Sequence, residues 1–304
     1  MNKEFLDLAE QLKSSVSCTV RLNELMSGHT SFKIGGPADI LVLPESIEQL
    51  REVLKVVKET VVPLTLLGNG SNVLVRDKGI RGIVIKLGNM LRHFYEAEDL
   101  LVFGSGYSLA LASYKAMECG RTGMEFAVGI PGSIGGAVYM NAGAYDGEMQ
   151  NIVNCVKVMD LQGNERVLTA EELNFGYRKT SLQNSGLIVT EVTLKMPSGN
   201  KDEIKSKMDD FSHRRISKQP LEMPSAGSMF KRPPGYFAGT LIDQAGLKGY
   251  TVGGAQISTK HAGFVVNVGG ATAADVLQLI KDVQTKIKAG VGVELQPRSR
   301  LVNL

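Results

Sequence analysis

Two glycine-rich segments of this 304-residue chain have the composition of phosphate-binding loops. The first is GNGSN at residues 68–72, and the second, from 129 to 147, contains six glycines. Glycine lets the backbone curl so that successive N–H groups point at an anion. We expect no regular helix in the second segment, because each glycine costs roughly 0.5–1 kcal/mol relative to alanine in regular structure. Close approach to a large flat or polyphosphate ligand would compensate, which argues for a flavin dinucleotide.

These loops do not follow the common nucleotide-binding fingerprints. Val73 stands where the Rossmann pattern G-x-G-x-x-G needs its third glycine, and Leu109 does so after Gly104-x-Gly106. No G-x-x-x-x-G-K-[ST] segment occurs in the chain. A dinucleotide would therefore be held by another kind of cradle, and GNGSN by itself is equally compatible with a tight turn between two strands.

The elements around the loops alternate between strands and helices, which predicts an α+β fold. Strands are expected at 38–43, within 62–67, at 73–75, 82–87, 100–103, 152–160, 187–196, 263–268 and 291–295. Helices are expected at the N-terminus, after Ser46, from Ser108 to Gly120, up to about Arg215, and from Thr272 to a stop at Gly290.

Composition argues against several functional classes. The 34 Lys and Arg nearly balance the 31 Asp and Glu, so no nucleic-acid partner is expected. No apolar run approaches the roughly 20 residues of a membrane span, and the amphipathic N-terminus lacks a signal-peptide pattern. Cys18, Cys119 and Cys155 have neither zinc-ligand nor C-x-x-C spacing, so we expect reduced thiols, no metal site and a cytoplasmic location.

Six segments in order identify a family resemblance: HTSFKIGGPADILVLP, LLGNGSNVLV, AVGIPGSIGGAVYMNAGAYDGEM, FGYRKTS, GSMFKRP and GVELQP. Together they resemble the UDP-N-acetylenolpyruvoylglucosamine reductase family, in its shorter type II form. The resemblance implies a two-subdomain FAD-binding domain of the vanillyl-alcohol-oxidase (PCMH) type, followed by a smaller α+β substrate-binding domain. We place a lead-in at 1–30, the FAD domain at 31–198 with subdomains 31–87 and 88–198, and the substrate domain at 199–304.

The resemblance also implies an activity and a cofactor site. NADPH would reduce FAD, and the enzyme would then reduce UDP-N-acetylenolpyruvoylglucosamine to UDP-N-acetylmuramate for peptidoglycan synthesis, with a monomer as the working expectation. None of the four histidines lies in the glycine loops, so non-covalent FAD is expected. The implied cofactor residues are Gly68, Asn69, Gly70, Ser71, Asn72, Gly129, Pro131, Gly132, Ser133, Gly135, Gly136, Asn141 and Gly143.

Two residues match the family's catalytic positions. Arg178 would stabilise the enolate-like charge that follows hydride transfer, because a guanidinium can bind a carboxylate or enolate in bidentate fashion. Ser228 would deliver the proton to the developing carbanion. Without the resemblance, Arg178 would be interpreted as a surface residue and Ser228 as a turn residue. The implied substrate contacts are Tyr177, Lys231, Arg232 and His261.

One position departs from the family pattern. Where the family's C-terminal L-E-P-E-V-R carries a second acid, which assists protonation, this chain reads L-Q-P-R-S-R and places Arg298. Glu294 would lie about 13 Å away along an extended strand, at roughly 3.3 Å per residue. It could not take over the role without a shift of that strand.

Two alternatives stay open at this point. The chain could be another FAD oxidoreductase of the same fold, such as an alcohol or sugar oxidase. It could also be a non-catalytic nucleotide-sugar binder, which the missing acid at position 298 allows.

Overall fold

Helix α2 (Ile47–Lys58) begins where the sequence predicts it. The Ser46 side chain accepts a hydrogen bond from the backbone N–H of Gln49, and the Gln49 side chain accepts one in return from the N–H of Glu45. These bonds satisfy donors that the first helical turn leaves free. Leu50, Val53 and Leu54 are buried on one face, so the helix is fixed by packing as well as by its cap.

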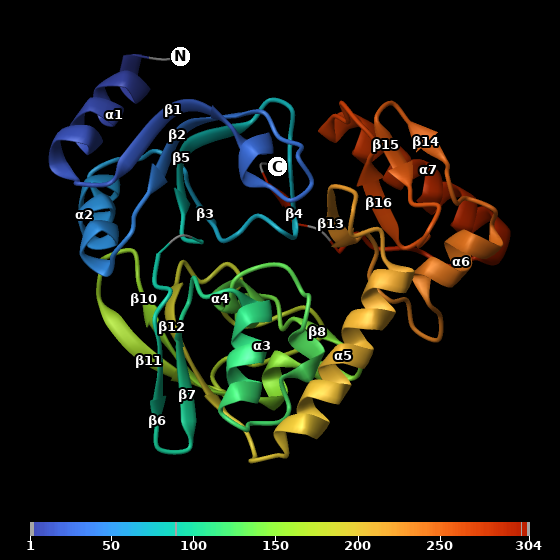
Figure 1. Ribbon diagram of the computed structural model, residues 1–304. Helices are drawn as coiled ribbons and strands as arrows, with labels where there is room; N and C mark the ends of the chain where they lie inside the picture. Colours follow the sequence, from blue (N-terminus) through green and yellow to red (C-terminus); the bar gives the residue numbers. More distant parts are fainter. Residues whose placement is uncertain (1–2, 89, 299, 303–304) are drawn as a thin grey trace. The chain divides into compact units, whose positions relative to one another are not determined.

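The computed structural model describes residues 3–88, 90–298 and 300–302 (Figure 1). Its helices are α1 (Lys3–Ser15), α2, α3 (Leu109–Glu118), α4 (Ile134–Tyr139), α5 (Lys201–Lys218), α6 (Ala238–Gln244) and α7 (Ala273–Val291). Its first strands are β1 (Thr19–Leu25), β2 (Pro37–Leu43), β3 (Leu64–Leu67), β4 (Val73–Val75), β5 (Ile80–Lys86), β6 (Phe94–Ala97), β7 (Leu100–Gly104), β8 (Gly143–Ala144) and β9 (Gly147–Glu148). The remaining strands are β10 (Val153–Met159), β11 (Glu165–Thr169), β12 (Ile188–Lys195), β13 (Ser225–Ser228), β14 (Thr251–Val252), β15 (Ala255–Ile257), β16 (Phe264–Asn267) and β17 (Arg300–Val302).

These elements form two compact units, each assembled from separate stretches of the chain. The first comprises Met1–Leu22, Ile40–Asn69 and Gly82–Arg214, and the second comprises the intervening segments and Arg215–Leu304. The predicted domain boundary at residue 199, between an FAD-binding domain at 31–198 and a substrate-binding domain at 199–304, stays a prediction.

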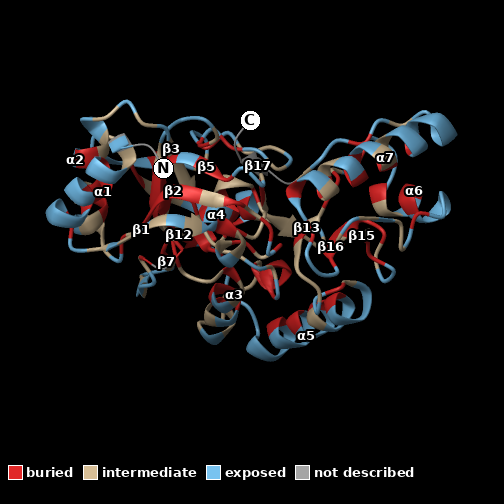
Figure 2. Ribbon diagram, turned by 90° about the horizontal axis from the view of Figure 1, so that it is seen from above, coloured by how far each residue is buried: buried red, intermediate tan, exposed pale blue. Residues whose placement is uncertain are grey.

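The first unit contains two sheets. One has the strand order β1-β2-β5-β3, with β3 and β5 parallel, and its apolar side chains share a core with α1 and α2. The other has the order β11-β10-β12-β7-β6 and is antiparallel throughout. Its core includes residues of α3 and α4, and Figure 2 shows the buried residues along β12.

The second unit contains a four-stranded antiparallel sheet in the order β13-β16-β15-β14. Helix α7 contributes Val276, Leu279 and Val283 to the core of this unit. The helix carries the predicted capping box of Thr272 and Asp275. Asp77 adds a second cap, because its carboxylate accepts from the N–H groups of Ala273 and Ala274. Strand and helix content in both units confirms the predicted α+β class.

Three local predictions are wrong. A short helix, α4, runs through the glycine-rich segment: the Ser133 side chain caps it by accepting from the Gly136 N–H, and Gly135 packs so closely that a β-carbon on it would lie 2.7 Å from Ser105 Cβ. Helix α7 passes Gly290 and ends at Gly292, whose φ of +71° gives the left-handed cap that glycine favours. The expected strand at 291–295 is therefore absent from the described residues, and the chain pairs later, at β17, which lies parallel to β4.

Candidate functional site

Gly68, at the start of the first predicted glycine loop, lies close to the second loop within the first unit. Ser133 Oγ is the nearest atom to a β-carbon placed on Gly68, at 3.4 Å. The segment after β7 pairs with the second loop, because the Leu109 N–H donates to the Gly132 carbonyl at 3.1 Å and the Gly135 N–H donates to the Ser105 carbonyl at 2.9 Å. The structure therefore brings Gly68 together with the second loop, as a cradle for one ligand would require.

The glycines of this cradle serve two different needs. Gly143 and Gly147 are required by the protein itself, since a β-carbon on either would lie 2.6 Å from a neighbouring residue. Gly68 and Gly136 meet nothing closer than Ser133 Oγ, and Gly136 is exposed. Part of the glycine density thus has an internal cause, and the rest leaves backbone open to a ligand.

This open backbone fits a flavin dinucleotide. Gly129 and Pro131 are exposed, and Gly129 has a φ of +70°, in the region where glycine is favoured. Among the described residues other than its two chain neighbours, Ser133 alone has an atom within 4 Å of a β-carbon placed on Gly68. A pyrophosphate could approach the main chain closely here, as glycine-rich cradles allow.

We expect Gly68→Ala to weaken FAD binding about tenfold or more, because the added methyl group would stand between the backbone and the pyrophosphate. The protein should fold normally, since 3.4 Å from Ser133 Oγ is an ordinary contact. Titration of the apoprotein with FAD, followed by flavin fluorescence, measures the change. Gly28→Ala is the matched control, because nothing lies within 4 Å of its β-carbon. Equal FAD affinities in the two variants would contradict the placement.

Arg178 lies in a tight turn of the first unit. Gly176 and Lys179 exchange backbone hydrogen bonds of 2.9 and 3.1 Å, and Arg178 between them has a φ of +58°. Its guanidinium donates to the carbonyls of Asn141 at 2.9 Å and Gly143 at 2.7 Å. The turn and these two bonds fix the direction of the side chain.

The charge of Arg178 is partly desolvated. Burial lowers the pKa of Arg178, while the nearby Tyr177 and Glu148 oppose that change, and the group stays a cation at neutral pH. The Nε–H is buried and has no hydrogen-bond partner among the described residues. An unpaired buried donor is costly, so a water molecule or a ligand is expected to accept from this N–H.

Tyr177, an expected substrate contact, is 55% exposed. Its ring centroid lies 5.4 Å from the guanidinium carbon of Arg178, within cation–π range. The structure therefore places the two residues of the YR pair side by side, with the aromatic ring open to solvent.

Ser228 ends strand β13 in the second unit and is not a turn residue. It stands opposite Phe264 of β16, and its hydroxyl donates to the Phe230 carbonyl at 3.3 Å. A β-carbon on Gly263 would lie 3.6 Å from Ser228 Oγ and 3.0 Å from His261 Cε1. Ser228 and His261 therefore flank the same glycine, and a larger residue there would fill the space between them.

His261 is held in its neutral form. Burial is the largest cause of its lowered pKa, and Lys248 and Lys218 lower it further, whereas Asp243 opposes them. Its Nδ1 accepts a hydrogen bond from the Gly263 N–H at 3.0 Å, so the ring proton of the neutral form lies on Nε2. His261 can thus donate a hydrogen bond to an anionic ligand.

Arg298 is brought close to the serine by backbone pairing. The N–H of Arg298 donates to the Met229 carbonyl at 2.7 Å, and the N–H of Lys231 donates to the Gln296 carbonyl at 2.8 Å. The position of the family's second acid is therefore next to the residue that follows Ser228. Ser299, quoted in the departing motif, lies outside the described residues.

Glu294 does not replace the missing acid. It is exposed and forms an ion pair with Lys288, which is the main reason its pKa lies below the ordinary value. The carboxylate points to the end of α7, where Lys288 lies, and not to the segment at 296–298 that pairs beside Met229. Residues 291–295 do not form the expected strand, so the ion pair with Lys288 is what keeps Glu294 from taking the place of the acid.

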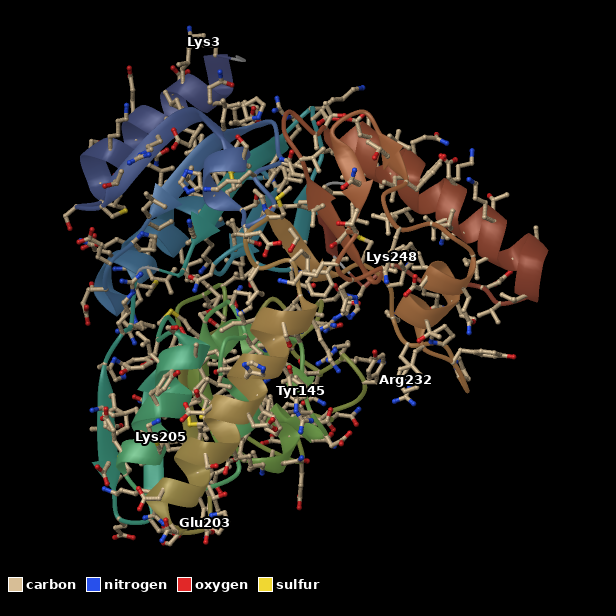
Figure 3. The ribbon with its side chains drawn as sticks, turned by 45° about the vertical axis from the view of Figure 1, so that its right-hand side comes forward. Lys3, Tyr145, Glu203, Lys205, Arg232 and Lys248 are labelled. Atoms are coloured by element: carbon tan, nitrogen blue, oxygen red, sulfur yellow. The ribbon has the colours of Figure 1, made fainter. Side chains whose placement is uncertain are left out.

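The other two cations of the second unit differ in exposure. Lys231 is half-buried beside the pairing with Gln296, whereas Arg232 is exposed and stacks on the Phe237 ring at 4.0 Å. Figure 3 labels Arg232 and Lys248 on this unit. Lys231 and Arg232 both remain candidates for binding an anionic ligand.

Sequence reasoning missed two carboxylates of the first unit. Glu125 is buried and accepts from Thr122 Oγ1 at 2.6 Å and from the Gly123 N–H at 2.8 Å. The spacing Thr122-x-x-Glu125 could have signalled it. Glu148 accepts from Asn141 Nδ2 at 3.1 Å, and no sequence pattern marks that contact. Among the described residues, no group of three or more His, Cys, Asp or Glu side chains could hold a metal ion.

Comparison with known proteins covers both ends of the chain. Residues 38–169 match the family model for an FAD binding domain, and residues 219–302 match the model for the UDP-N-acetylenolpyruvoylglucosamine reductase C-terminal domain. A Clostridium perfringens (strain SM101) protein named UDP-N-acetylenolpyruvoylglucosamine reductase is 50% identical over 299 residues, covering 98% of this chain and 97% of the relative. One of the same name from Clostridioides difficile (strain 630) is 48% identical over 283 residues, 93% of each chain.

A solved structure agrees with these relatives. The crystal structure of UDP-N-acetylenolpyruvylglucosamine reductase from Thermus caldophilus has a TM-score of 0.79 and 38% sequence identity to this chain. The match covers 94% of this chain and 99% of the other.

Within the described residues, no helix is both long and apolar enough to cross a membrane.

Proposed function

Because the chain belongs to the UDP-N-acetylenolpyruvoylglucosamine reductase family, we propose that it uses NADPH to reduce the enolpyruvyl ether of UDP-N-acetylglucosamine to UDP-N-acetylmuramate. It is an FAD-dependent oxidoreductase, since residues 38–169 match an FAD binding domain. The product is a peptidoglycan precursor, and we infer a cytoplasmic location, where such nucleotide-linked precursors and NADPH occur.

The geometry of the first unit supports a flavin next to Arg178. The half-buried Gly68 and the exposed Gly129, Pro131 and Gly136 would hold the dinucleotide through their backbone. Bound FAD would accept a hydride from NADPH and pass it to the substrate alkene. The buried Nε–H of Arg178 carries this proposal most directly, because a buried cation with an unpaired donor is suited to an anionic ligand.

Two side chains would complete the reduction. Hydride addition to one alkene carbon leaves enolate-like charge beside the substrate carboxylate, and Arg178 would stabilise that charge. Ser228 Oγ would donate the proton to the other carbon, so that one hydride and one proton together saturate the double bond. Each role is proposed on the geometry within its own unit.

The second unit would bind the nucleotide-sugar. Neutral His261, with its proton on Nε2, and the cations Lys231 and Arg232 are suited to a diphosphate, which accepts several charge-assisted hydrogen bonds. Tyr177, in the first unit, would supply an exposed aromatic face to the substrate.

We expect the purified protein to be yellow, to bleach anaerobically with NADPH, and to regain its colour when UDP-N-acetylenolpyruvoylglucosamine is added. Absorbance near the flavin bands records each step, and mass spectrometry of the product confirms the gain of two hydrogens. UDP-N-acetylglucosamine, which lacks the alkene, is the control and should leave the flavin reduced. A protein that binds no FAD would refute the whole proposal, and bleaching without reoxidation would refute the substrate alone.

A further inference from the structure

The side chain of Asn141 connects three segments of the first unit. It is completely buried. Its Oδ1 accepts from the Gln150 N–H at 3.0 Å, while its Nδ2 donates to Glu148 Oε2 at 3.1 Å and to the Gly176 carbonyl at 3.0 Å. Its φ of +41° is in the left-handed region, which asparagine tolerates better than most residues. One carboxamide thus fixes the loop before β8, the residues after β9 and the turn that contains Arg178.

The same loop provides the acceptors that hold Arg178. The guanidinium donates to the carbonyl of Asn141 itself and to that of Gly143. Gln183 contributes from the other side, because its Nε2 donates to the Arg178 carbonyl at 3.1 Å. The position of the guanidinium therefore depends on backbone that the Asn141 side chain holds in place.

Glu148 is a competing partner for Arg178. It is half-buried, and its negative charge is felt at the guanidinium, where it opposes the effect of burial on the pKa of Arg178. Its Oε2 is occupied by Asn141 Nδ2. If that carboxylate turned to Arg178, it would form an ion pair with the guanidinium and occupy the Nε–H, which has no partner among the described residues, since carboxylate and guanidinium pair strongly.

Tyr145, on the turn between β8 and β9, limits how far this segment can move. Its ring stacks on Phe211 of α5 with centroids 4.4 Å apart, and its hydroxyl donates to the Phe211 carbonyl at 3.3 Å. Figure 3 labels Tyr145 beside that helix. With the turn anchored, loss of the Asn141 contact would free the Glu148 side chain more than the backbone that carries it.

We propose that Asn141 is a positioning residue that holds the Glu148 carboxylate away from Arg178, so that the guanidinium stays without a carboxylate partner and keeps its Nε–H for the anionic substrate. This inference rests on the proposed function, because it assigns the free donor to the substrate of that reaction. It concerns residues that would act through Arg178 and touch no substrate themselves.

The test compares Asn141→Gly with the double variant Asn141→Gly, Glu148→Gln. Glycine removes the carboxamide and adopts a φ of +41° without strain. We expect Asn141→Gly to slow reoxidation of the reduced flavin by substrate about tenfold to a hundredfold, in the range that misplacing a catalytic group costs. Removing the charge of Glu148 in addition should recover most of that loss. Glu148→Gln by itself should change the rate less than Asn141→Gly does.

FAD content and the rate of bleaching by NADPH are measured on every variant, because the family resemblance places Asn141 among the cofactor residues, and reoxidation rates are compared per bound flavin. Rescue by Glu148→Gln is the deciding readout, because a merely structural role for Asn141 predicts that a second substitution adds to the damage. Should Asn141→Gly not accumulate as folded protein, Asn141→Asp with and without Glu148→Ala provides the comparison, because alanine removes the Glu148 carboxylate without supplying an amide that could restore the lost bond.

The outcomes separate the two proposals. Wild-type protein that is active, together with a slow Asn141 variant that Glu148→Gln does not rescue, overturns this inference and leaves the proposed function standing. Wild-type protein whose reduced flavin is not reoxidised by the substrate overturns the proposed function and the inference with it. Rescue of the slow variant by Glu148→Gln supports both.

Discussion

Ser228→Ala is expected to slow the reoxidation of reduced flavin by UDP-N-acetylenolpyruvoylglucosamine by about 10²–10⁴-fold, which is the usual contribution of a positioned proton donor. The hydroxyl is the only group removed, and the strand should persist because Ser228 is fixed by the backbone pairing of β13 with β16. Bleaching by NADPH should proceed at the wild-type rate, since that step needs no proton from this side chain. Stopped-flow absorbance under anaerobic conditions separates the two half-reactions.

Ser225→Ala is the matched control for this experiment. Ser225 lies on the same strand, opposite Val266, and its hydroxyl accepts from the Gly227 N–H at 3.4 Å. Its loss removes a hydroxyl from the same short segment without touching Ser228. A Ser228→Ala variant that reoxidises as fast as Ser225→Ala would assign proton transfer to another group.

Arg298→Glu is expected to raise turnover with the reduced flavin, by about tenfold or more if the acid regains part of a general-acid contribution. The backbone of residue 298 is already held beside Met229 by the 2.7 Å hydrogen bond, so the substitution changes the side chain and not its attachment. A carboxyl group there would stand next to the proposed proton donor, where a permanent cation cannot exchange a proton at neutral pH. Single-turnover reoxidation rates measure the effect.

Arg298→Gln distinguishes two causes of any gain. Glutamine removes the positive charge without supplying an acid, so a similar increase in both variants would mean that the cation itself slows the reaction. An increase in Arg298→Glu alone would support the acid role. Unchanged or lower turnover in Arg298→Glu would refute the prediction, and the protonation step of this chain would then proceed without an acid at this position.

Local sequence signals identified most elements that position the site. The caps at Ser46, Ser108 and Thr272 each accept the hydrogen bond that their side chains predict. Such signals work because a cap involves residues three positions apart. They failed where distant residues decide the structure. Helix α4 forms despite two consecutive glycines because the segment lies against Ser105, and propensity alone favours no helix there.

The candidate site shows the same limit. The glycine loops and the resemblance named Arg178 and Ser228, but neither indicated that Arg178 would be held by carbonyls from the loop that includes Asn141. Glu148 could not be connected to that loop from spacing, since its contact depends on how the turn between β8 and β9 folds back. Contacts that depend on tertiary packing have no short sequence period by which to find them.

The pairing of β17 with β4 has a consequence for how the protein forms during synthesis. Residues 300–302 align with residues 73–75, so β4, which is synthesised early, can form this pairing only after β17 has been synthesised. Pairing between strands so far apart in the sequence is slow to form, because the entropy cost of closing a long loop comes before the pairing stabilises the chain. The first unit can complete its sheets once residue 195 has left the ribosome, whereas the second cannot complete its pairing until residue 302 has done so. Until then, the edge of β4 that β17 covers is unpaired, and an unpaired strand edge is a place where a nascent chain is exposed to aggregation.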